Sequence, residues 1–250
     1  MLTDEQLARY GRQILLHDFD VAGQEKLLAA TVMVVGLGGL GSPVAMYLAA
    51  AGVGHLVLAD GDEVEASNLQ RQIAHGDADL GRNKAGSAAE TVSTLNAQTR
   101  VTVISERLAE DHLPAHLASV DLVVDATDNY PIRFALNRAC IAAGIPLVSA
   151  AAVRTEGQLA VFHPASGGAC YRCLYPEVGD DTALSCSASG VLAPVVGVLG
   201  SLQALESIKW LAGYGEPSTG RLLVADLRTL EFRTLALSPR IDCPDCSHLR

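Results

Sequence analysis

The chain has 250 residues, 49% of them hydrophobic, a positive mean hydropathy and a formal net charge of −10 at pH 7. These values exclude an intrinsically disordered chain and provide enough apolar side chains for one large core, or for a core with an appended subdomain. The acidic balance argues against nucleic acid as the main partner, because nucleic-acid binding is dominated by phosphate neutralisation.

The first 30 residues are predicted to form an N-terminal helical arm. Within it, the helix Thr3 to Arg12 begins with a capping box formed by Thr3 and Gln6. No basic segment followed by an apolar one opens the chain, so a signal peptide is not predicted. We therefore expect a cytoplasmic protein with reduced cysteines.

Residues 31–153 alternate between short apolar runs and helical patterns. The expected elements are, in chain order, a strand Thr31 to Gly36, a helix Leu40 to Ala51, a strand Gly54 to Asp60, a helix Lys84 to Asn96, a strand Val101 to Ile104, a short helix Asp111 to Ala118, a strand Asp121 to Ala126, a helix Ile132 to Ala143 and a strand Pro146 to Ala152. This order predicts an α/β fold with a doubly wound, Rossmann-like and mainly parallel sheet.

Residues 154–250 show a different pattern and are predicted to complete the same single domain, 1–250. Antiparallel strands are expected at Gln158 to Phe162, Arg221 to Asp226 and Glu231 to Leu237, with a helix from Gly190 to Gly213 among them. The stretch Val191 to Leu205 is too short and too polar to span a bilayer. It predicts a buried helix, and an integral membrane protein is not expected.

A glycine-rich segment follows the first strand directly. It contains Gly36, Gly38, Gly39 and Gly41, and Asp60 closes the second strand at the distance expected of a carboxylate that binds a ribose hydroxyl. Glycines let the backbone approach a phosphate, whose charge is then met by free N–H groups at a helix N-terminus. The pattern fits an NAD enzyme or an ATP enzyme, and a merely tight turn is the structural alternative.

The polar loop after Asp60 favours ATP over a dinucleotide. It carries Asn68, Arg71 and Gln72, and Lys84 follows it. ATP carries about four negative charges and usually needs Arg, Lys and magnesium to neutralise them. A surface ion pair is the alternative interpretation for Lys84.

The strand that ends near Ala126 runs into Thr127, Asp128 and Asn129. In this architecture ligands bind at the carboxyl ends of the parallel strands, so Asp128 is a candidate magnesium ligand. The alternative for Asp128 or Asn129 is a helix N-cap, which is common at such a turn.

Two Cys-x-x-Cys pairs, Cys170 with Cys173 and Cys243 with Cys246, lie about seventy residues apart. Two short loops that each supply two thiolates are the usual way to build a tetrahedral zinc site. Two redox dithiols or two disulfides are the alternatives. The other cysteines are Cys140, expected in the core of an apolar helix, and Cys186, in a small polar stretch before a helix.

Taken together, these motifs resemble the ThiF/MoeB/HesA family, the bacterial relatives of the ubiquitin-activating enzymes, over nearly all of the chain. The segments that carry the resemblance are Arg9 to Gln13, Gly36 to Gly41, Ser67 to Gln72, Thr127 to Asn129, Cys170 to Cys173 and Cys243 to Cys246. The resemblance implies an ATP-dependent adenylyltransferase. Its substrate would be the C-terminal glycine of a small ubiquitin-like sulfur carrier ending in Gly-Gly, either ThiS-like for thiamin or MoaD-like for molybdopterin.

The resemblance also implies roles for single residues. Asp60 binds the ribose, Asn68, Arg71 and Lys84 contact the phosphates, and Asp128 holds Mg²⁺. Arg12 reaches across a homodimer interface to the ATP of the partner subunit, whereas from the residues alone it reads as an exposed helix residue. Asp62, Gln72 and Asn129 are expected in the same nucleotide site. Residues 31–153 then form the nucleotide-binding half, and residues 154–250 the carrier-binding, zinc-containing half.

Three points stay open at this stage. Cys186 is either a sulfur-transfer thiol, as in ThiF-like proteins, or dispensable, as in MoeB-like ones. Leu56 to Asp60 is similar to ThiF and Ala152 to Gln158 to MoeB, so the carrier is undecided. The family's longer members carry a rhodanese domain, so sulfur is expected in trans, from a cysteine desulfurase or a rhodanese.

Two rival functions explain part of the pattern. An NAD-dependent oxidoreductase with a structural zinc accounts for the glycine loop and Asp60 but not for Arg71, Lys84 or the paired cysteines. A zinc-ribbon binding module predicts a basic face near the cysteines, where only Arg172, Arg240 and Arg250 are available.

Overall fold

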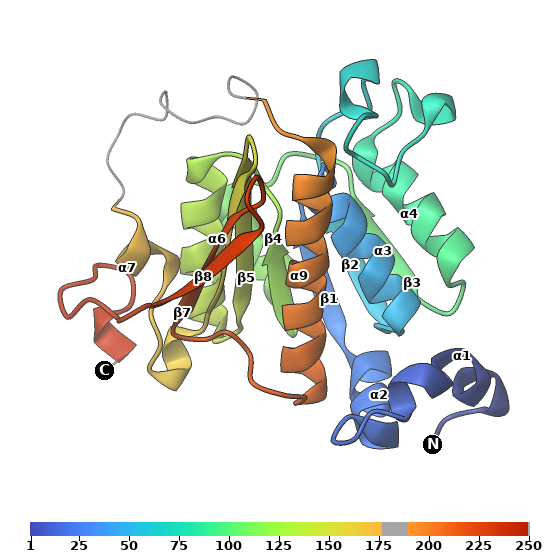
Figure 1. Cartoon of the computed structure of the whole chain (residues 1–250), viewed down its shortest axis with the longest axis horizontal. Coiled ribbons are helices and arrows are strands. Elements are labelled where there is room, and N and C mark those ends of the chain that lie inside the picture. Colours follow the sequence, from blue (N-terminus) through green and yellow to red (C-terminus); the bar gives the residue numbers. More distant parts are fainter. Residues whose placement is uncertain (177–189, 250) are drawn as a thin grey trace.

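One sheet runs through the whole molecule in the computed structural model, which describes residues 1–176 and 190–249 (Figure 1). Its strand order is β3-β2-β1-β4-β5-β6-β7-β8. The strands are β1 (Thr31–Val35), β2 (His55–Ala59), β3 (Arg100–Ile104), β4 (Leu122–Asp125), β5 (Leu147–Val153), β6 (Glu156–Phe162), β7 (Arg221–Asp226) and β8 (Glu231–Ala236). Pairing is parallel from β3 to β5 and antiparallel from β5 to β8, which confirms the predicted fold class.

Helices cover both faces of the sheet because the central strands are apolar on both sides. In β1, Val32 and Val34 belong to a core shared with α3, α4 and α9, whereas Met33 and Val35 belong to one shared with α5 and α6. The described α-helices are α1 (Asp4–Ile14), α2 (Asp20–Ala29), α3 (Gly41–Ala51), α4 (Lys84–Leu95), α5 (Leu113–Leu117), α6 (Tyr130–Ala143), α7 (Tyr171–Leu174) and α9 (Ala193–Ala212). Short 3₁₀ turns are η1 (Ala66–Asn68), η2 (Asp77–Asp79), η3 (Glu110–His112), η4 (Pro164–Ser166) and η5 (Ser247–Leu249).

The expected elements are present with small shifts at their ends. The predicted capping box of α1 is confirmed, because the Thr3 hydroxyl accepts from the Gln6 N–H and the Gln6 side chain accepts from the Thr3 N–H. The segment expected as one helix, Asp111 to Ala118, is instead η3 followed by the single turn of α5. Helix α2 was not predicted as a separate element.

Helix α9 is long and apolar enough to span a membrane by those two criteria alone. Half of its apolar window is buried inside the fold, against β5, β6 and α3 (Figure 1). The core helix of a globular domain passes the same test, so the prediction of a buried helix holds.

The N-terminal arm lies at the end of the molecule opposite the glycine loop. Its Arg9 donates to the carbonyl of Leu95 and its Gln13 to that of Ala51, the last residues of α4 and α3. The glycine loop is at the other end of α3, about 16 Å away along an 11-residue helix.

The carboxyl ends of β1, β2 and β4 meet at one edge of the sheet. Two glycines make the first of these ends tight: Gly36 has φ +88°, and a Cβ there would lie 2.8 Å from the carbonyl oxygen of Ala126. A Cβ on Gly41 would lie 1.8 Å from the carbonyl oxygen of Gly36. Only glycine therefore allows the β1–α3 turn to pack this closely against the end of β4.

Candidate nucleotide site and cysteine cluster

A cavity of about 880 Å³ opens at this edge of the sheet. It is lined by the ends of β1, β2 and β4 and by parts of α4, β5, β6, α6 and α9. The predicted site residues that line it are Gly36, Gly38, Gly39, Asp60, Asp62, Arg71, Gln72, Lys84, Asp128 and Asn129. Gly41, Asn68 and Arg12 were also predicted for the site but do not line the cavity of their own chain.

The glycine loop presents unpaired backbone donors. The N–H groups of Gly38, Gly39 and Leu40 donate to no acceptor within residues 1–176 and 190–249. They lie at the N-terminus of α3, where the helix dipole favours negative charge. This end of the cavity is therefore suited to a phosphate group.

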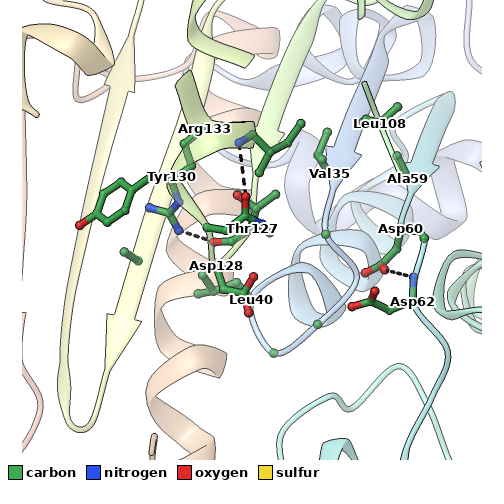
Figure 2. A pocket seen from close by; sticks show the side chains of 18 of the residues that line it. Val35, Leu40, Ala59, Asp60, Asp62, Leu108, Thr127, Asp128, Tyr130 and Arg133 are labelled. Atoms are coloured by element: carbon green, nitrogen blue, oxygen red, sulfur yellow. Dashed lines mark hydrogen bonds between the residues drawn. The ribbon is translucent and has the colours of Figure 1, made fainter. Parts of the chain in front are cut away.

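Asp60 is fixed at the end of β2 by two backbone groups. One carboxylate oxygen accepts from the N–H of Leu37 at 2.7 Å, and the other accepts from the N–H of Asp62 at 2.9 Å. Each carboxylate oxygen has a second lone pair, so Asp60 can also accept from a ribose hydroxyl. Asp60 and Asp128 lie on opposite sides of the glycine loop (Figure 2).

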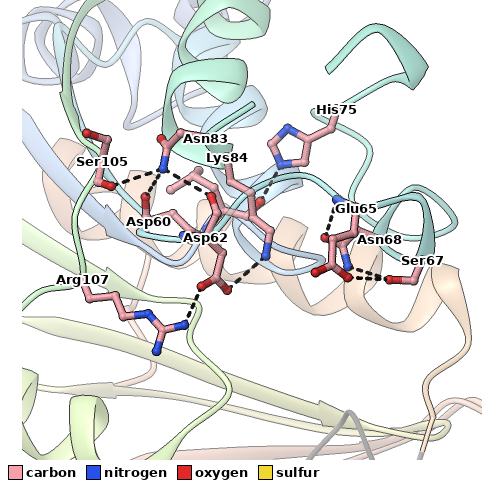
Figure 3. Close-up of polar contacts among 11 residues, drawn as sticks. Asp60, Asp62, Glu65, Ser67, Asn68, His75, Asn83, Lys84, Ser105 and Arg107 are labelled. Atoms are coloured by element: carbon pink, nitrogen blue, oxygen red, sulfur yellow. Dashed lines mark hydrogen bonds and ion pairs between the residues drawn. The ribbon is translucent and has the colours of Figure 1, made fainter. Parts of the chain in front are cut away.

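Lys84 is buried rather than exposed, which excludes a surface ion pair as its interpretation. Its Nζ lies 3.3 Å from Asp62, whose other carboxylate oxygen accepts from Arg107 at 3.0 Å (Figure 3). Burial alone would raise the pKa of Asp62, but the charges and hydrogen bonds of Lys84 and Arg107 outweigh burial and lower it. Two cations thus face the cavity, held by one ionised carboxylate.

Arg71 and Gln72 follow η1 and reach the cavity from the loop after β2. Arg71 donates to the carbonyl of Ser67 at 3.1 Å and is only partly buried. Gln72 is buried, and its Oε1 has no hydrogen-bond partner within the described parts of the chain. A buried polar atom without a partner is unfavourable in a bare protein and is satisfied at low cost when a ligand supplies a donor.

In this structure the Asn68 side chain forms hydrogen bonds within its own loop. Its Oδ1 accepts from the N–H of Glu65 at 3.2 Å, and its amide nitrogen donates to the Ser67 hydroxyl at 3.4 Å. Its side chain therefore holds η1, from which Arg71 and Gln72 continue. Sequence motifs identify such an asparagine but do not show which way its amide points.

Asp128 faces the cavity from the loop between β4 and α6 (Figure 2). It is exposed, and its carboxylate forms no hydrogen bond or ion pair within residues 1–176 and 190–249. The next residue, Asn129, is the N-cap of α6, since its side chain accepts from the N–H of Ile132. The N-cap interpretation therefore applies to Asn129, and Asp128 stays available for a ligand.

A buried ion pair behind Asp128 was not found in the sequence analysis. Arg133 donates to the carbonyls of Thr127 and Ala150, and its Nε lies 3.8 Å from Asp125. Asp125 accepts from the Ser149 hydroxyl and from both the N–H and the hydroxyl of Thr127. Burial alone would lower the pKa of Arg133, but the charge of Asp125 outweighs it and raises that pKa. These contacts to Thr127 hold the loop that carries Asp128 from its buried side.

The four predicted metal ligands come together. The Sγ atoms of Cys170, Cys173, Cys243 and Cys246 all lie within 4.8 Å of one another, and the nearest pairs are 3.5 to 3.8 Å apart. Thiolates at about 2.3 Å from one tetrahedral ion lie about 3.8 Å from each other, so this set fits zinc. A disulfide requires about 2.05 Å between sulfurs, and none of the four cysteines forms one, which argues against the disulfide alternative.

A hydrogen-bond network holds the two cysteine loops together and ties them to α6. Asn137 accepts from the N–H of Tyr171 and donates to Asp245, and Arg172 also donates to Asp245. Asn137 lies one helical turn after Arg133.

The structure tests the prediction for only one of the two remaining cysteines. Cys140 is buried in α6 as predicted, and burial raises the pKa of its thiol, which makes it unreactive. Cys186 lies outside the described residues.

Arg12 lies on the exposed face of α1. Because α1 contacts the C-terminal ends of α3 and α4, Arg12 is at the far end of these helices from the cavity. It cannot reach the nucleotide site of its own chain in this arrangement.

Comparison with known proteins identifies relatives over the whole chain. The ThiF family model matches residues 10–245. A molybdopterin-synthase adenylyltransferase of Escherichia coli (strain K12) is 47% identical over 245 residues, which cover 98% of both chains. A sulfur carrier protein ThiS adenylyltransferase of the same strain is 45% identical over 245 residues, which cover 98% of this chain and 97% of the relative.

Among solved structures, a crystal structure described as E. coli MccB with ATP superposes with a TM-score of 0.83 at 25% identity. The match covers 96% of this chain and 74% of that chain. These similarities confirm the resemblance drawn from the motifs. The same fold therefore occurs in a protein whose structure was solved with ATP.

Proposed function

The chain belongs to the ThiF family, and from that membership we propose that it is an ATP-dependent adenylyltransferase for a small ubiquitin-like sulfur carrier. Its relatives at 47% and 45% identity bear that activity in their names. The observation within this chain that best supports the proposal is the cavity itself. Backbone N–H groups and a carboxylate that have no partner within the described residues converge there with the cations Arg71, Lys84 and Arg107 on the space that a nucleoside triphosphate requires.

In the proposed reaction, a carboxylate oxygen of the carrier's C-terminal glycine attacks the α-phosphorus of ATP. A bond forms between that oxygen and phosphorus, the bond from phosphorus to the α,β-bridging oxygen breaks, and pyrophosphate leaves with the electron pair. The products are an acyl adenylate and pyrophosphate. The protein has little covalent chemistry to perform, so its residues act by positioning and by neutralising charge.

The roles of the cavity residues follow from their geometry. The N–H groups of Gly38 and Gly39 receive a phosphate, and Asp60 accepts from the ribose. Arg71 and Lys84 neutralise the triphosphate, whose charge repels the incoming carboxylate. Asp62 holds Lys84 before the nucleotide arrives.

Asp128 suits a magnesium site because it supplies a carboxylate and because this carboxylate has no partner within the described residues. Mg²⁺ prefers carboxylate oxygens together with water and phosphate oxygens, and the Asp128 carboxylate has no other partner within the described residues. A bound Mg²⁺ would supply positive charge to the departing pyrophosphate.

The four cysteines are proposed to hold a structural zinc ion. A site with four thiolates leaves no open coordination position, so it takes no part in the chemistry. It fastens the segment after β8 to α7, whose N-cap is Cys170 and which contains Cys173, in the half of the chain, residues 154–250, that we assign to carrier binding. Residues 31–153 are assigned to nucleotide binding.

A homodimer is proposed because Arg12 lies too far from its own cavity to serve it. Exposed apolar side chains on the adjacent helices α3 and α9, namely Tyr47, Val198 and Leu205, supply a surface that a second copy can cover. Arg12 then acts at the nucleotide of the partner subunit. The expected location is the cytoplasm.

Two features of the pathway stay predictions. The carrier is ThiS-like or MoaD-like, since relatives of both kinds are almost equally similar. Sulfur is expected from a separate cysteine desulfurase or rhodanese, and Cys186 is a candidate for a covalent sulfur-transfer intermediate.

The decisive experiment is ATP–pyrophosphate exchange with each of the two carriers in parallel. We expect exchange that requires a carrier ending in Gly-Gly and disappears when that dipeptide is deleted. ATP, but not NAD, is expected to raise the melting temperature, because a bound ligand stabilises according to its affinity. Absence of exchange with both carriers would refute the proposal, and stabilisation by NAD alone would favour an oxidoreductase.

A further inference from the structure

A buried histidine lies behind the glycine loop, outside the residues that line the cavity. His75 is 8% exposed and lies in the segment between η1 and η2. Its Nδ1 is 2.8 Å from the Ser87 hydroxyl, and its Nε2 is 2.9 Å from the carbonyl oxygen of Leu37. The proposed reaction has so far assigned this side chain no role.

The two contacts determine which ring nitrogen faces the loop as a donor. A carbonyl oxygen only accepts hydrogen bonds, so Nε2 carries the hydrogen that is shared with Leu37. Ser87 at Nδ1 is itself buried in α4, and its hydroxyl can donate its hydrogen to that nitrogen. The imidazole is therefore supported from the side away from the loop.

The hydrogen bond from His75 to the Leu37 carbonyl sets the orientation of the peptide unit between Leu37 and Gly38. In a planar trans peptide the C=O and the following N–H point in opposite directions. Because the carbonyl of Leu37 points to His75, the N–H of Gly38 points away from His75, and Gly38 lines the cavity. The N–H of Leu37 is held separately by Asp60.

Among residues 1–176 and 190–249, His75 is the one hydrogen-bond partner of this peptide's own C=O and N–H groups, whereas the Leu37 N–H and the Gly38 carbonyl on either side are held by Asp60 and by the Ser42 N–H. Gly38 has no side chain, so its backbone dihedrals are less restricted than those of other residues. A rotated peptide would direct the carbonyl oxygen of Leu37 into the cavity. That oxygen would repel a phosphate where the native loop offers it a donor.

We propose that His75 is a positioning residue that holds the Leu37–Gly38 peptide with its N–H toward the cavity and so sets the affinity for nucleotide phosphates. The inference rests on the proposed function only in taking a nucleotide phosphate as the ligand. Its test is a binding measurement, so it stands or falls separately from carrier adenylation.

Two substitutions at position 75 test the two hydrogen bonds of the imidazole ring separately. In His75→Gln, the side-chain amide reaches the place of Nε2 and keeps a donor for Leu37. In His75→Asn, the shorter side chain reaches only the place of Nδ1, so it keeps Ser87 and loses Leu37. We expect the Asn variant to bind ATP about tenfold more weakly, the effect of one lost oriented hydrogen bond, and the Gln variant to bind within about twofold of the parent.

Calorimetric titration of the full-length protein with ATP and with adenosine measures these affinities. Adenosine lacks phosphates, so its affinity is expected to be the same in the parent and both variants. In exchange assays the Asn variant is expected to raise KM for ATP and leave kcat nearly unchanged, whereas partial unfolding would lower kcat and leave KM. Circular dichroism checks the fold of each variant.

Ser87→Ala supplies a second test should Asn at position 75 prevent folding. It removes the support at Nδ1 but keeps the imidazole, and we expect about threefold weaker ATP binding with no change for adenosine. Unchanged ATP affinity in the Asn variant would overturn the proposal, as would equal losses in the Asn and Gln variants. A loss for adenosine as large as that for ATP would also overturn it.

Discussion

At the scale of single residues, the site contains two kinds of group: those that already form hydrogen bonds or ion pairs within the described chain, and those that a ligand could contact. Asp60 and Lys84 are held by hydrogen bonds or ion pairs, whereas the Asp128 carboxylate and the N–H groups of Gly38 and Gly39 have no partner in the part of the chain that the structure describes. An exposed carboxylate is hydrated at little cost, so Asp128 can exchange water for a metal ion without breaking a contact among the described residues. Asp128 is therefore the residue whose removal tests the magnesium role most directly.

We expect Asp128→Ala to reduce ATP–pyrophosphate exchange by at least about 10³-fold, because metal-assisted neutralisation of the leaving pyrophosphate contributes several kcal/mol. The melting temperature should stay within about 2 °C of the parent, since the side chain is exposed and has no partner to lose within the described residues.

Asp128→Asn is the matched control, since it keeps the shape and removes the charge. It should restore only a small part of the activity, and raising the Mg²⁺ concentration should help it more than it helps Asp128→Ala. Full exchange activity in the Ala variant would exclude Asp128 as the metal ligand.

Some features of single residues could not be predicted from the sequence. The motif identified Asn68 and Asp128 equally well, but the Asn68 side chain turns toward Glu65, whereas the Asp128 carboxylate has no hydrogen bond or ion pair among residues 1–176 and 190–249. Arg133 was missed because an arginine on a helix is usually exposed, and its partners include carbonyls from two other elements. Neither orientation nor long-range backbone contact is encoded in a local pattern.

At the scale of elements, the central strands β1, β2 and β4 were readable because each is an apolar run that ends at a glycine or an acidic residue. Helix α2 was not, since its N-cap, Phe19, provides no capping side chain and no clear start signal. The short helix expected from Asp111 was divided because Pro114 favours the first turn of a new helix at Leu113.

The cysteine cluster is the element most sensitive to a single change. We expect Cys243→Ser to lower the zinc content from one ion per chain to nearly none. A loss of about 3 kcal/mol of stability, which corresponds to roughly 6–12 °C in melting temperature for a chain of this size, should accompany it. Metal analysis and thermal unfolding measure the two effects.

Cys140→Ala is the control for that experiment. Cys140 is buried but lies outside the cluster, so this variant should keep its zinc and lose only the stability that a small cavity costs. If a chelator shifts the melting temperature of the parent and of Cys243→Ser equally, the cluster is not the metal site.

At the scale of the whole molecule, the distance between Arg12 and the cavity gives a test of the dimer. We expect Arg12→Ala and Asp128→Ala each to be inactive as homodimers. If Arg12 serves the partner subunit, a hybrid dimer contains one complete site, since the Arg12→Ala chain keeps its own Asp128 and receives Arg12 from the other chain. Random mixing should then restore about one quarter of the parent activity.

Mixing after partial unfolding and refolding, followed by exchange assays, measures this recovery. Sedimentation at the assay concentration establishes the oligomeric state of each preparation. Activity that fails to rise above the sum of the two separate variants would mean that Arg12 does not act between subunits.

Helix α6 has a consequence that reaches across the molecule. Arg133 fixes the loop that presents Asp128, and Asn137, one turn later, fixes both cysteine loops. Because one helix is fastened at both places, we expect the nucleotide and the zinc ion to be coupled, so that each changes the binding free energy of the other by the same amount. Zinc should then partition differently between the protein and a chelator when nucleotide is bound, and an ion with no part in catalysis would report whether the site is full.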